Sequence, residues 1–313
     1  MSKLVSNIVF TKNRPLQLEG YLDSLYKYFP VELIQTYILY KLELFDEEYK
    51  LLFQKYPSCV VVRENDFYTN FLKILSQINT KYILFGIDDV VYFDAVSFDV
   101  IEKCFNESPG DIFGFSLRHS VEMIRDSDVI KELSMSGQPV LKFSWKEGKT
   151  DLTSYPFELC ATVYPTALVK RIINSVINNN PVIKKLFSPS SALIKALGRT
   201  KLKRKVLKHF GYFFSPNTLE SWNCRWCQNH SDQLPSFLYF QKLCASAIQV
   251  NLVNTSTVNI TNGSADYTIE ALAQKYKQGY RLDIDYIANN KPTGPDCGKE
   301  FFKLGEDKQV SVR

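Results

Sequence analysis

Short apolar runs alternate with stretches of helical spacing through the first 118 residues. The runs lie at 4–10, 33–39, 58–63, 81–87 and 111–117 and have the length and composition of strands. Between them, apolar residues recur at the spacing of a helix face at 16–28, 46–56, 67–78 and 94–105. This alternation is typical of βαβ units. We therefore predict an α/β fold with a mainly parallel central sheet flanked by helices.

The second half of the chain is less regular. Residues 119–156 have the composition of a long polar loop, and we see no internal repeat. The apolar spacing beyond that loop predicts helices at 165–178, 266–277 and 283–288 and short strands at 236–240 and 247–253. The sheet is therefore expected to draw most of its strands from the first half.

Two adjacent aspartates interrupt the most apolar of these runs, YILFGIDDVVYF at 82–93. Like charges this close raise each other's pKa, and burying them costs several kcal/mol unless something neutralises them. Either the strand ends at this point and the carboxylates of Asp88 and Asp89 reach solvent, or a cation lies between them.

Polar side chains also follow two other predicted strands, in the segments 11–14 and 63–65. The carboxyl ends of parallel strands share one edge of a sheet, which is where such sheets bind ligands. Carboxylate oxygens suit Mg²⁺ or Mn²⁺. No G-x-G-x-x-G, no P-loop and no G-x-S-x-G motif is present, so these three kinds of site are not supported.

The segments NIVFTKNRPLQLEGYLDSL (7–25) and KYILFGIDDVVYF (81–93) resemble A-type-fold glycosyltransferases close to the large family-two group. The resemblance spans about residues 4–118. It implies that fold, a UDP- or GDP-sugar donor, and Mn²⁺ or Mg²⁺ held by Asp89 and Asp88. Val90 stands at the third position of the acidic motif, so only two carboxylates of that motif are present.

The same resemblance implies which residues contact the donor. These are Thr11, Asn13, Arg14, Arg63, Asn65, Asp88 and Arg118. Weaker resemblances at 113–120, 155–159 and 215–220 place those segments on the donor-sugar and acceptor side. The implied division is a nucleotide-sugar-binding half at 1–118, an acceptor-side half at 119–265 with a basic insertion at 184–208, and a C-terminal helical tail at 266–313.

The expected reaction is transfer of a sugar to an acceptor hydroxyl of a saccharide or lipid-linked saccharide. If the stereochemistry inverts, a carboxylate base is needed, and we select Glu220 first and Glu158 second. Two alternatives stay open. One is a sugar-1-phosphate nucleotidyltransferase, although TKNRP lacks the glycines usual there; the other is a non-catalytic protein of this fold that binds carbohydrate or a membrane surface.

The net charge of +5 is unevenly distributed. Residues 171–219 hold ten Lys and Arg and no acid, which leaves 28 basic and 33 acidic residues elsewhere. Within 184–208 the cations alternate with Leu, Ile and Val, a pattern that favours an anionic membrane surface. Nucleic acid is not expected as a partner, because no known module is present and the segment has a single aromatic, Phe187.

Seven cysteines, an odd number, do not form a disulfide framework, so we expect a cytoplasmic protein. Together with the basic segment, this predicts peripheral contact with the inner face of a membrane. No apolar run reaches the roughly 18 residues of a transmembrane helix. Cys224, Cys227 and His230 have zinc-ligand spacing with Cys244 as a fourth candidate, but only one knuckle exists and packed thiols are favoured. His230 could instead be an extra ligand of the metal.

Overall fold

The computed structural model describes residues 3–121, 131–135, 138–150, 152–177, 191–198, 200–209, 212–230, 232–253, 260–261 and 265–306. Its α-helices are α1 (Pro15–Tyr28), α2 (Asp46–Lys55), α3 (Phe67–Gln77), α4 (Phe98–Glu107), α6 (Thr166–Ile177), α8 (Ala192–Ala196), α9 (Lys201–His209), α10 (Pro216–Gln228), α11 (Ile269–Lys277) and α12 (Ile284–Asn290). Within these residues no helix combines the length and apolar character needed to cross a membrane.

A nine-stranded sheet runs through the molecule in the order β3-β2-β1-β4-β9-β6-β10-β8-β7. Its strands are β1 (Val5–Lys12), β2 (Ile34–Lys41), β3 (Val60–Arg63), β4 (Tyr82–Ile87), β6 (Ile112–Ser116), β7 (Lys131–Met135), β8 (Gln138–Ser144), β9 (Thr162–Pro165) and β10 (Ser236–Phe240). β3, β2, β1 and β4 are parallel neighbours, as are β6 and β10. β9 pairs antiparallel with β4 and β6, and β8 pairs antiparallel with β10 and β7. The predicted α/β class with a mainly parallel sheet is confirmed.

Smaller sheets complete the fold. One has the order β15-β11-β5, from β5 (Val90–Tyr92), β11 (Ala245–Ile248) and β15 (Asp296–Cys297). The other two pair β12 (Asn251–Leu252) with β13 (Ile260–Thr261) and β14 (Tyr280–Leu282) with β16 (Leu304–Glu306). Three 3-10 helices lie at Val31–Leu33, Ala265–Tyr267 and Lys299–Phe301.

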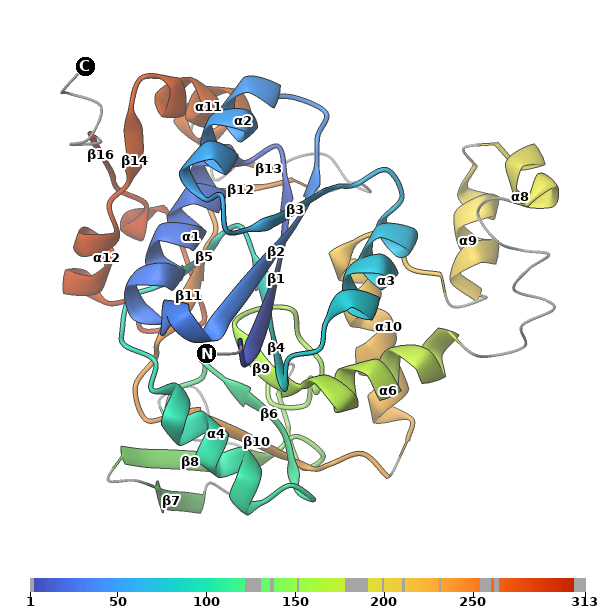
Figure 1. The fold of residues 1–313 in the computed structure, drawn as a ribbon, viewed down its shortest axis with the longest axis vertical. Helices are drawn as coiled ribbons and strands as arrows, with labels where there is room; N and C mark the ends of the chain where they lie inside the picture. The colour runs from blue at the N-terminus through green and yellow to red at the C-terminus, as the bar shows by residue number, and fades with distance from the viewer. Residues whose placement is uncertain are drawn as a thin grey trace.

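Helices cover both faces of the central sheet (Figure 1). Alternate residues of β1 enter opposite cores, so Val5 and Val9 pack with α1 and α4 whereas Ile8 and Phe10 pack with α3, α6 and α10. The C-terminal elements α11, α12 and β14 pack against α1. Figure 1 shows α8 and α9, in yellow, projecting to one side of this body.

The first half of the chain folds as its hydrophobic pattern predicts, from β1 to β6. The later helices at 165–178, 266–277 and 283–288 correspond to α6, α11 and α12, and the strand at 236–240 is β10. The predicted strand at 247–253 is instead the end of β11 followed by β12. The three-part division of the chain stays a prediction, although the central sheet takes strands from both predicted halves.

The predicted loop at 119–156 is wrong in part, because β7 and β8 lie within it. β8 carries polar residues between its apolar ones, with Lys142 between the buried Leu141 and Phe143. β9 was missed because it has only four residues and runs directly into α6. Short strands of this kind give too few positions for a period to be recognised.

Candidate active site

The pairing of β1 with β4 brings the two polar motifs of the first half together. Phe10 lies opposite Ile87, so the residues that follow, Thr11 and Asp88, meet at the carboxyl edge of the sheet. The Thr11 hydroxyl donates to Asp88 Oδ2 at 2.7 Å, and the backbone N–H of Lys12 donates to the same oxygen at 3.4 Å. Tyr49 of α2 supports this turn, with its hydroxyl 2.9 Å from Thr11 Oγ1.

A cation does lie between the two aspartates, and it is the guanidinium of Arg14. Arg14 Nη1 is 2.7 Å from Asp88 Oδ1 and 3.2 Å from Asp89 Oδ2. Its Nη2 donates to the backbone oxygen of Asn251. The Arg14 backbone is fixed at the start of α1 by Pro15 at the first helical position and by a 3.0 Å hydrogen bond from its N–H to the Tyr49 hydroxyl.

All three charged side chains are buried, with 6% of Arg14, 5% of Asp88 and 9% of Asp89 exposed. Burial raises the pKa of Asp89 to about 6; Arg14 opposes this shift and Asp88 adds to it. Burial lowers the pKa of Arg14, but the attraction of the two aspartates outweighs it and the net shift is upward. The group is therefore an arginine–dicarboxylate cluster with a net charge near −1 when both acids are ionised.

Two atoms of this cluster are buried without a hydrogen-bond partner, Asp89 Oδ1 and Arg14 Nε. Buried polar atoms are rarely left unpaired in folded proteins, so each indicates a ligand, ion or water. A carboxylate oxygen is the donor that Mg²⁺ and Mn²⁺ prefer. The donor chemistry of the pair therefore fits a divalent cation at Asp89 and Asp88.

A cavity of about 380 Å³ opens beside this cluster, which is within the size range of ligand sites. Its wall includes Thr11, Lys12, Arg14, Asp88 and Asp89. Ser215–Asn217, the cap and first residues of α10, also line it. The structure thus brings the N-terminal turn, the acidic pair and the start of the 215–220 segment to one cavity.

The structure places four of the predicted donor contacts, Asn13, Arg63, Asn65 and Arg118, away from the cavity wall. The side chain of Asn13 is turned inward, where Oδ1 accepts from the N–H groups of Glu43 and Leu44 at 3.1 Å each. Arg63 and Asn65 are exposed and do not line the cavity. Glu64, between them, does line it.

Several residues at the cavity were not selected from the sequence. Lys41, at the end of β2, lines it with its Nζ 3.4 Å from Glu64 Oε1, and Lys12 lines it with its Nζ 3.0 Å from Glu43. Lys41 carries a signal that was available, because it follows a predicted strand just as Arg63 does. Tyr49 and Asn251 carry no such signal, since a helix face and a short later strand bring them to Thr11 and Arg14.

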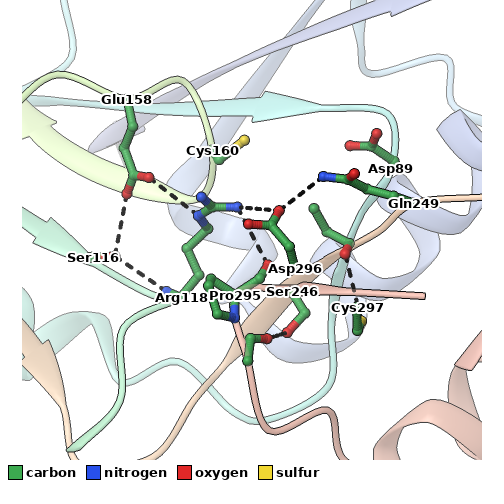
Figure 2. A network of polar contacts seen from close by, with 12 residues as sticks. Asp89, Ser116, Arg118, Glu158, Cys160, Ser246, Gln249, Pro295, Asp296 and Cys297 are labelled. Atoms are coloured by element: carbon green, nitrogen blue, oxygen red, sulfur yellow. Dashed lines mark hydrogen bonds and ion pairs between the residues drawn. The ribbon is translucent and has the colours of Figure 1, made fainter. Parts of the chain in front are cut away.

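Arg118 and Glu158 form a second buried charged cluster, shown in Figure 2. Arg118 Nε is 3.2 Å from Glu158 Oε2, and its Nη1 is 3.4 Å from Asp296 Oδ1. Ser116 Oγ is 3.4 Å from Glu158 Oε1, to which the Thr162 hydroxyl also donates. Figure 2 shows Cys160 close to the guanidinium of Arg118.

Glu220 lies on α10, three residues beyond the cavity-lining Asn217, and is half-buried. The backbone of Leu159 and the side chain of Tyr155 favour the ionised form of its carboxylate and lower its pKa. Burial and then the nearby Glu158 raise the pKa of Glu220 to about 8, against the opposing effect of Arg118. Glu220 therefore has a pKa suited to proton transfer near neutral pH, whereas both oxygens of Glu158 are already engaged.

The cysteines of the zinc-like spacing lie on α10. Cys224 and Cys227 are buried, and burial raises the pKa of Cys224 to about 12. His230 is exposed and stacks on Trp226, with ring centroids 4.0 Å apart. Among the described residues no three Cys, His, Asp or Glu side chains are grouped to hold a metal.

No family model matches the chain. By sequence, the chain is 22% identical over 193 residues to the bifunctional glycosyltransferase pgtA of Dictyostelium discoideum. The match covers 54% of this chain and 25% of pgtA, so the chain spans about a quarter of that protein's length.

Solved structures with some similarity include S. aureus TarS 1-349 in complex with UDP, at 16% identity and a TM-score of 0.38, covering 55% of this chain and 49% of that one. Mannosyltransferase PcManGT from Pyrobaculum calidifontis, in complex with GDP-Man and Mn²⁺, matches at 13% identity and a TM-score of 0.28, covering 37% of this chain and 35% of that one. A cytidylyltransferase from Leptospira borgpetersenii matches at 12% identity and a TM-score of 0.34, covering 64% of this chain and 73% of that one.

The sequence match lies with a glycosyltransferase, and the α/β sheet carries its acidic pair at the carboxyl edge. The resemblance of this chain to a glycosyltransferase is confirmed by that sequence match.

Proposed function

We propose that this protein is a glycosyltransferase that moves a sugar from a nucleotide-sugar to an acceptor hydroxyl. One observation supports this most strongly: the Asp88–Asp89 pair, the turn after β1 and the first residues of α10 line one cavity at the carboxyl edge of the sheet. That edge is where α/β sheets bind nucleotides. The match to pgtA agrees with the proposal.

The proposed donor site has Thr11, Arg14, Lys12 and Lys41 around the diphosphate of a UDP- or GDP-sugar. Asp89 and Asp88 would hold Mn²⁺ or Mg²⁺, and Asp89 offers a free buried oxygen for it. When bound, the cation supplies positive charge to the leaving diphosphate. The chain's own cations, Arg14 and Lys12, add to that charge from the same wall of the cavity.

Glu220 is the proposed base for an acceptor hydroxyl, and Glu158 is the second candidate. Glu158 pairs with Arg118, so in this proposal it holds Arg118 in place and raises the pKa of Glu220 rather than accepting a proton. Replacing Glu220 with Gln should lower kcat by about 10²–10⁴-fold with little change in donor affinity. Loss of donor binding with kcat kept would instead make Glu220 a donor ligand.

Saturation-transfer NMR with a panel of nucleotides, with and without Mn²⁺, tests the proposal. We expect UDP or GDP to bind, and Asp89→Asn to weaken the Mn²⁺-dependent part of that binding. Binding of a nucleoside triphosphate together with a sugar-1-phosphate, with release of pyrophosphate, would support the nucleotidyltransferase alternative. A protein that binds none of the panel would contradict the proposed donor site.

We also propose a cytoplasmic protein that contacts an anionic membrane surface through α8 and α9. All seven cysteines are free, which agrees with a reducing compartment. Part of the expected apolar face is used for packing, since Ile194 and Leu207 are buried in a small core. Leu193 and Leu202 stay about half exposed beside Lys195 and Lys205. Lys184, Lys185 and Arg199 lie outside the described residues.

Cosedimentation with lipid vesicles tests the membrane contact. Each cation near an anionic surface contributes about 1 kcal/mol, over a screening length of about 8 Å at physiological salt. Binding to anionic vesicles should therefore weaken with salt and be lost when Lys201, Lys203, Arg204 and Lys205 are replaced by Gln. The matched control replaces four partly exposed, ion-paired lysines, Lys50, Lys103, Lys242 and Lys277. Equal loss in both variants, or no binding by the wild type at low salt, would contradict the proposal.

A further inference from the structure

We infer that Arg14 is a built-in competitor for the divalent cation, so that metal binding at Asp88 and Asp89 requires displacement of its guanidinium. This inference rests on the proposed function, because it concerns the metal of the proposed donor site. It assigns to Arg14 a role different from the nucleotide contact that the family resemblance implies.

The geometry places Arg14 at the position where a bridging cation is expected. Its Nη1 atom is within 3.2 Å of an oxygen from each aspartate. Among the described residues, Arg14 is the cation that forms an ion pair with both carboxylates. A positive charge that contacts both acids at once neutralises the repulsion between them. A divalent ion bridging the same two oxygens would occupy the space of that nitrogen, so the two cannot bind there together.

The remaining carboxylate oxygens divide into one that is used and one that is free. Asp88 Oδ2 accepts from Thr11 and from the Lys12 backbone, which orients that carboxylate. Asp89 Oδ1 is buried and unpartnered. An incoming metal ion therefore has one available oxygen at Asp89, and it gains the other ligands only as Arg14 leaves.

Arg14 is itself incompletely bonded, which makes its displacement feasible. Its Nε is buried with no partner, whereas the Nη atoms are held by the two aspartates and Asn251. Arg14 also lines the cavity, so a released guanidinium has an adjoining volume to enter, in which an anionic ligand would lie. Metal binding would have to break the charge-assisted hydrogen bonds from Arg14 to the two aspartates. Because such bonds are strong, breaking them weakens metal binding substantially.

Direct binding of Mn²⁺, followed by the electron paramagnetic resonance signal of the free ion, tests the inference without nucleotide or turnover. In Arg14→Gln, we expect Mn²⁺ to bind about tenfold or more tightly than in the wild type, because the competing charge is gone. Lys12→Gln is the matched control: it removes one positive charge from the same cavity wall, but its side chain pairs with Glu43. We expect this control to change the affinity less than about threefold.

Thermal unfolding supplies a second readout. Removing Arg14 leaves two buried acids without a counter-ion, so Arg14→Gln should unfold at a lower temperature and recover more on addition of Mn²⁺ than the wild type does. If that variant does not fold, Arg14→Lys keeps one positive charge but loses the planar guanidinium that also bonds the backbone of Asn251, and should bind Mn²⁺ with intermediate affinity.

Unchanged or weaker Mn²⁺ binding in the Arg14 variants would overturn the inference. Equal tightening in Lys12→Gln would also overturn it, because general charge near the cavity would then explain the effect. Absence of Mn²⁺ binding to every variant would do the same. The proposed function fails by a different result, namely a wild type that binds no nucleotide in the NMR panel.

Discussion

Two buried acidic sites in this protein are bonded in different ways. Glu19, 1% exposed on α1, has both oxygens engaged: Lys55 Nζ at 2.6 Å and Arg281 Nε at 2.9 Å contact Oε1, and Tyr276 donates to Oε2. The Asp88–Asp89 pair has Arg14 between its members and still leaves Asp89 Oδ1 unpaired. One site joins α1 to α11 and β14; the other borders a cavity.

The difference separates a structural charge cluster from a binding one. A fully bonded buried network stabilises a single conformation, whereas an unpaired buried oxygen costs free energy that a ligand can recover. The burial of charge alone does not distinguish them, because both sites are nearly inaccessible. The two sites are distinguished by whether every buried polar atom has a hydrogen-bond partner.

The largest expected effect is on activity at the binding site. Asp89→Asn should lower kcat/KM by about 10²–10³-fold, because it weakens the cation site that faces the leaving group. The melting temperature should change little, since an Asn oxygen can still accept from Arg14 and a buried charge has been removed. Steady-state kinetics and calorimetry on the same preparation check this, and full activity in the variant would contradict the metal role.

Glu19→Gln should give the opposite result. Removing the charge takes away the buried carboxylate that Arg281 and Lys55 both contact, so the free energy of unfolding should fall by about 3 kcal/mol, as for other broken buried pairs. Below its melting temperature the variant should keep wild-type kcat/KM. Denaturant unfolding provides the measurement, and selective loss of activity without loss of stability would make Glu19 part of the functional site.

A third effect concerns pH. The pKa of Glu220 is raised to about 8 by burial and by Glu158, so the base form is scarce below that value. Turnover should rise about tenfold per pH unit up to about pH 8 and then level off. The pKa of Glu220 is higher in the folded state than in the unfolded state, so the folded state binds the proton more tightly. The free energy of unfolding should therefore fall as the pH rises from the unfolded pKa toward 8. A Glu220→Gln variant with the same pH–rate profile as the wild type would refute the role of Glu220 as the base.

The smallest effect expected is that of Tyr276→Phe. This change removes the hydroxyl that donates to Glu19 Oε2 but leaves Lys55 and Arg281 on Oε1. The free energy of unfolding should fall by about 1 kcal/mol, the contribution of one hydrogen bond. A loss as large as that of Glu19→Gln would mean that the bonding at this site is strongly cooperative.

Much of the fold and part of the site could be predicted from the sequence. The alternation of strands and helices from 4 to 117 predicted the parallel section of the sheet, though not the order of its strands. Polar residues after strands identified Thr11, Arg14, Asp88 and Asp89 as neighbours. Hydrophobic periodicity predicts elements that are long and half-buried. It could not predict β9, a four-residue strand paired with the distant β4 and β6, or β7, a five-residue strand in a hairpin with β8.

Side-chain direction explains why three of the predicted donor contacts do not line the cavity. Arg63 and Asn65 were selected at the end of β3, but successive residues point to opposite sides there, and it is Glu64 that lines the cavity. Asn13 has a positive φ of 54° and turns its amide toward Glu43 and Leu44. The sequence located the edge of the sheet correctly, but a one-residue difference decides which side chain faces the ligand.

Release of a nucleoside diphosphate from UDP- and GDP-sugars, measured by mass spectrometry over hours with Mn²⁺ present, tests the central claim most directly. The account predicts slow hydrolysis of at least one donor by the wild type and its loss in Asp89→Asn, with Glu19→Gln active below its melting temperature. Release that is equal in the wild type and Asp89→Asn, or no release from any donor that binds, would contradict a glycosyltransferase site at Asp88 and Asp89.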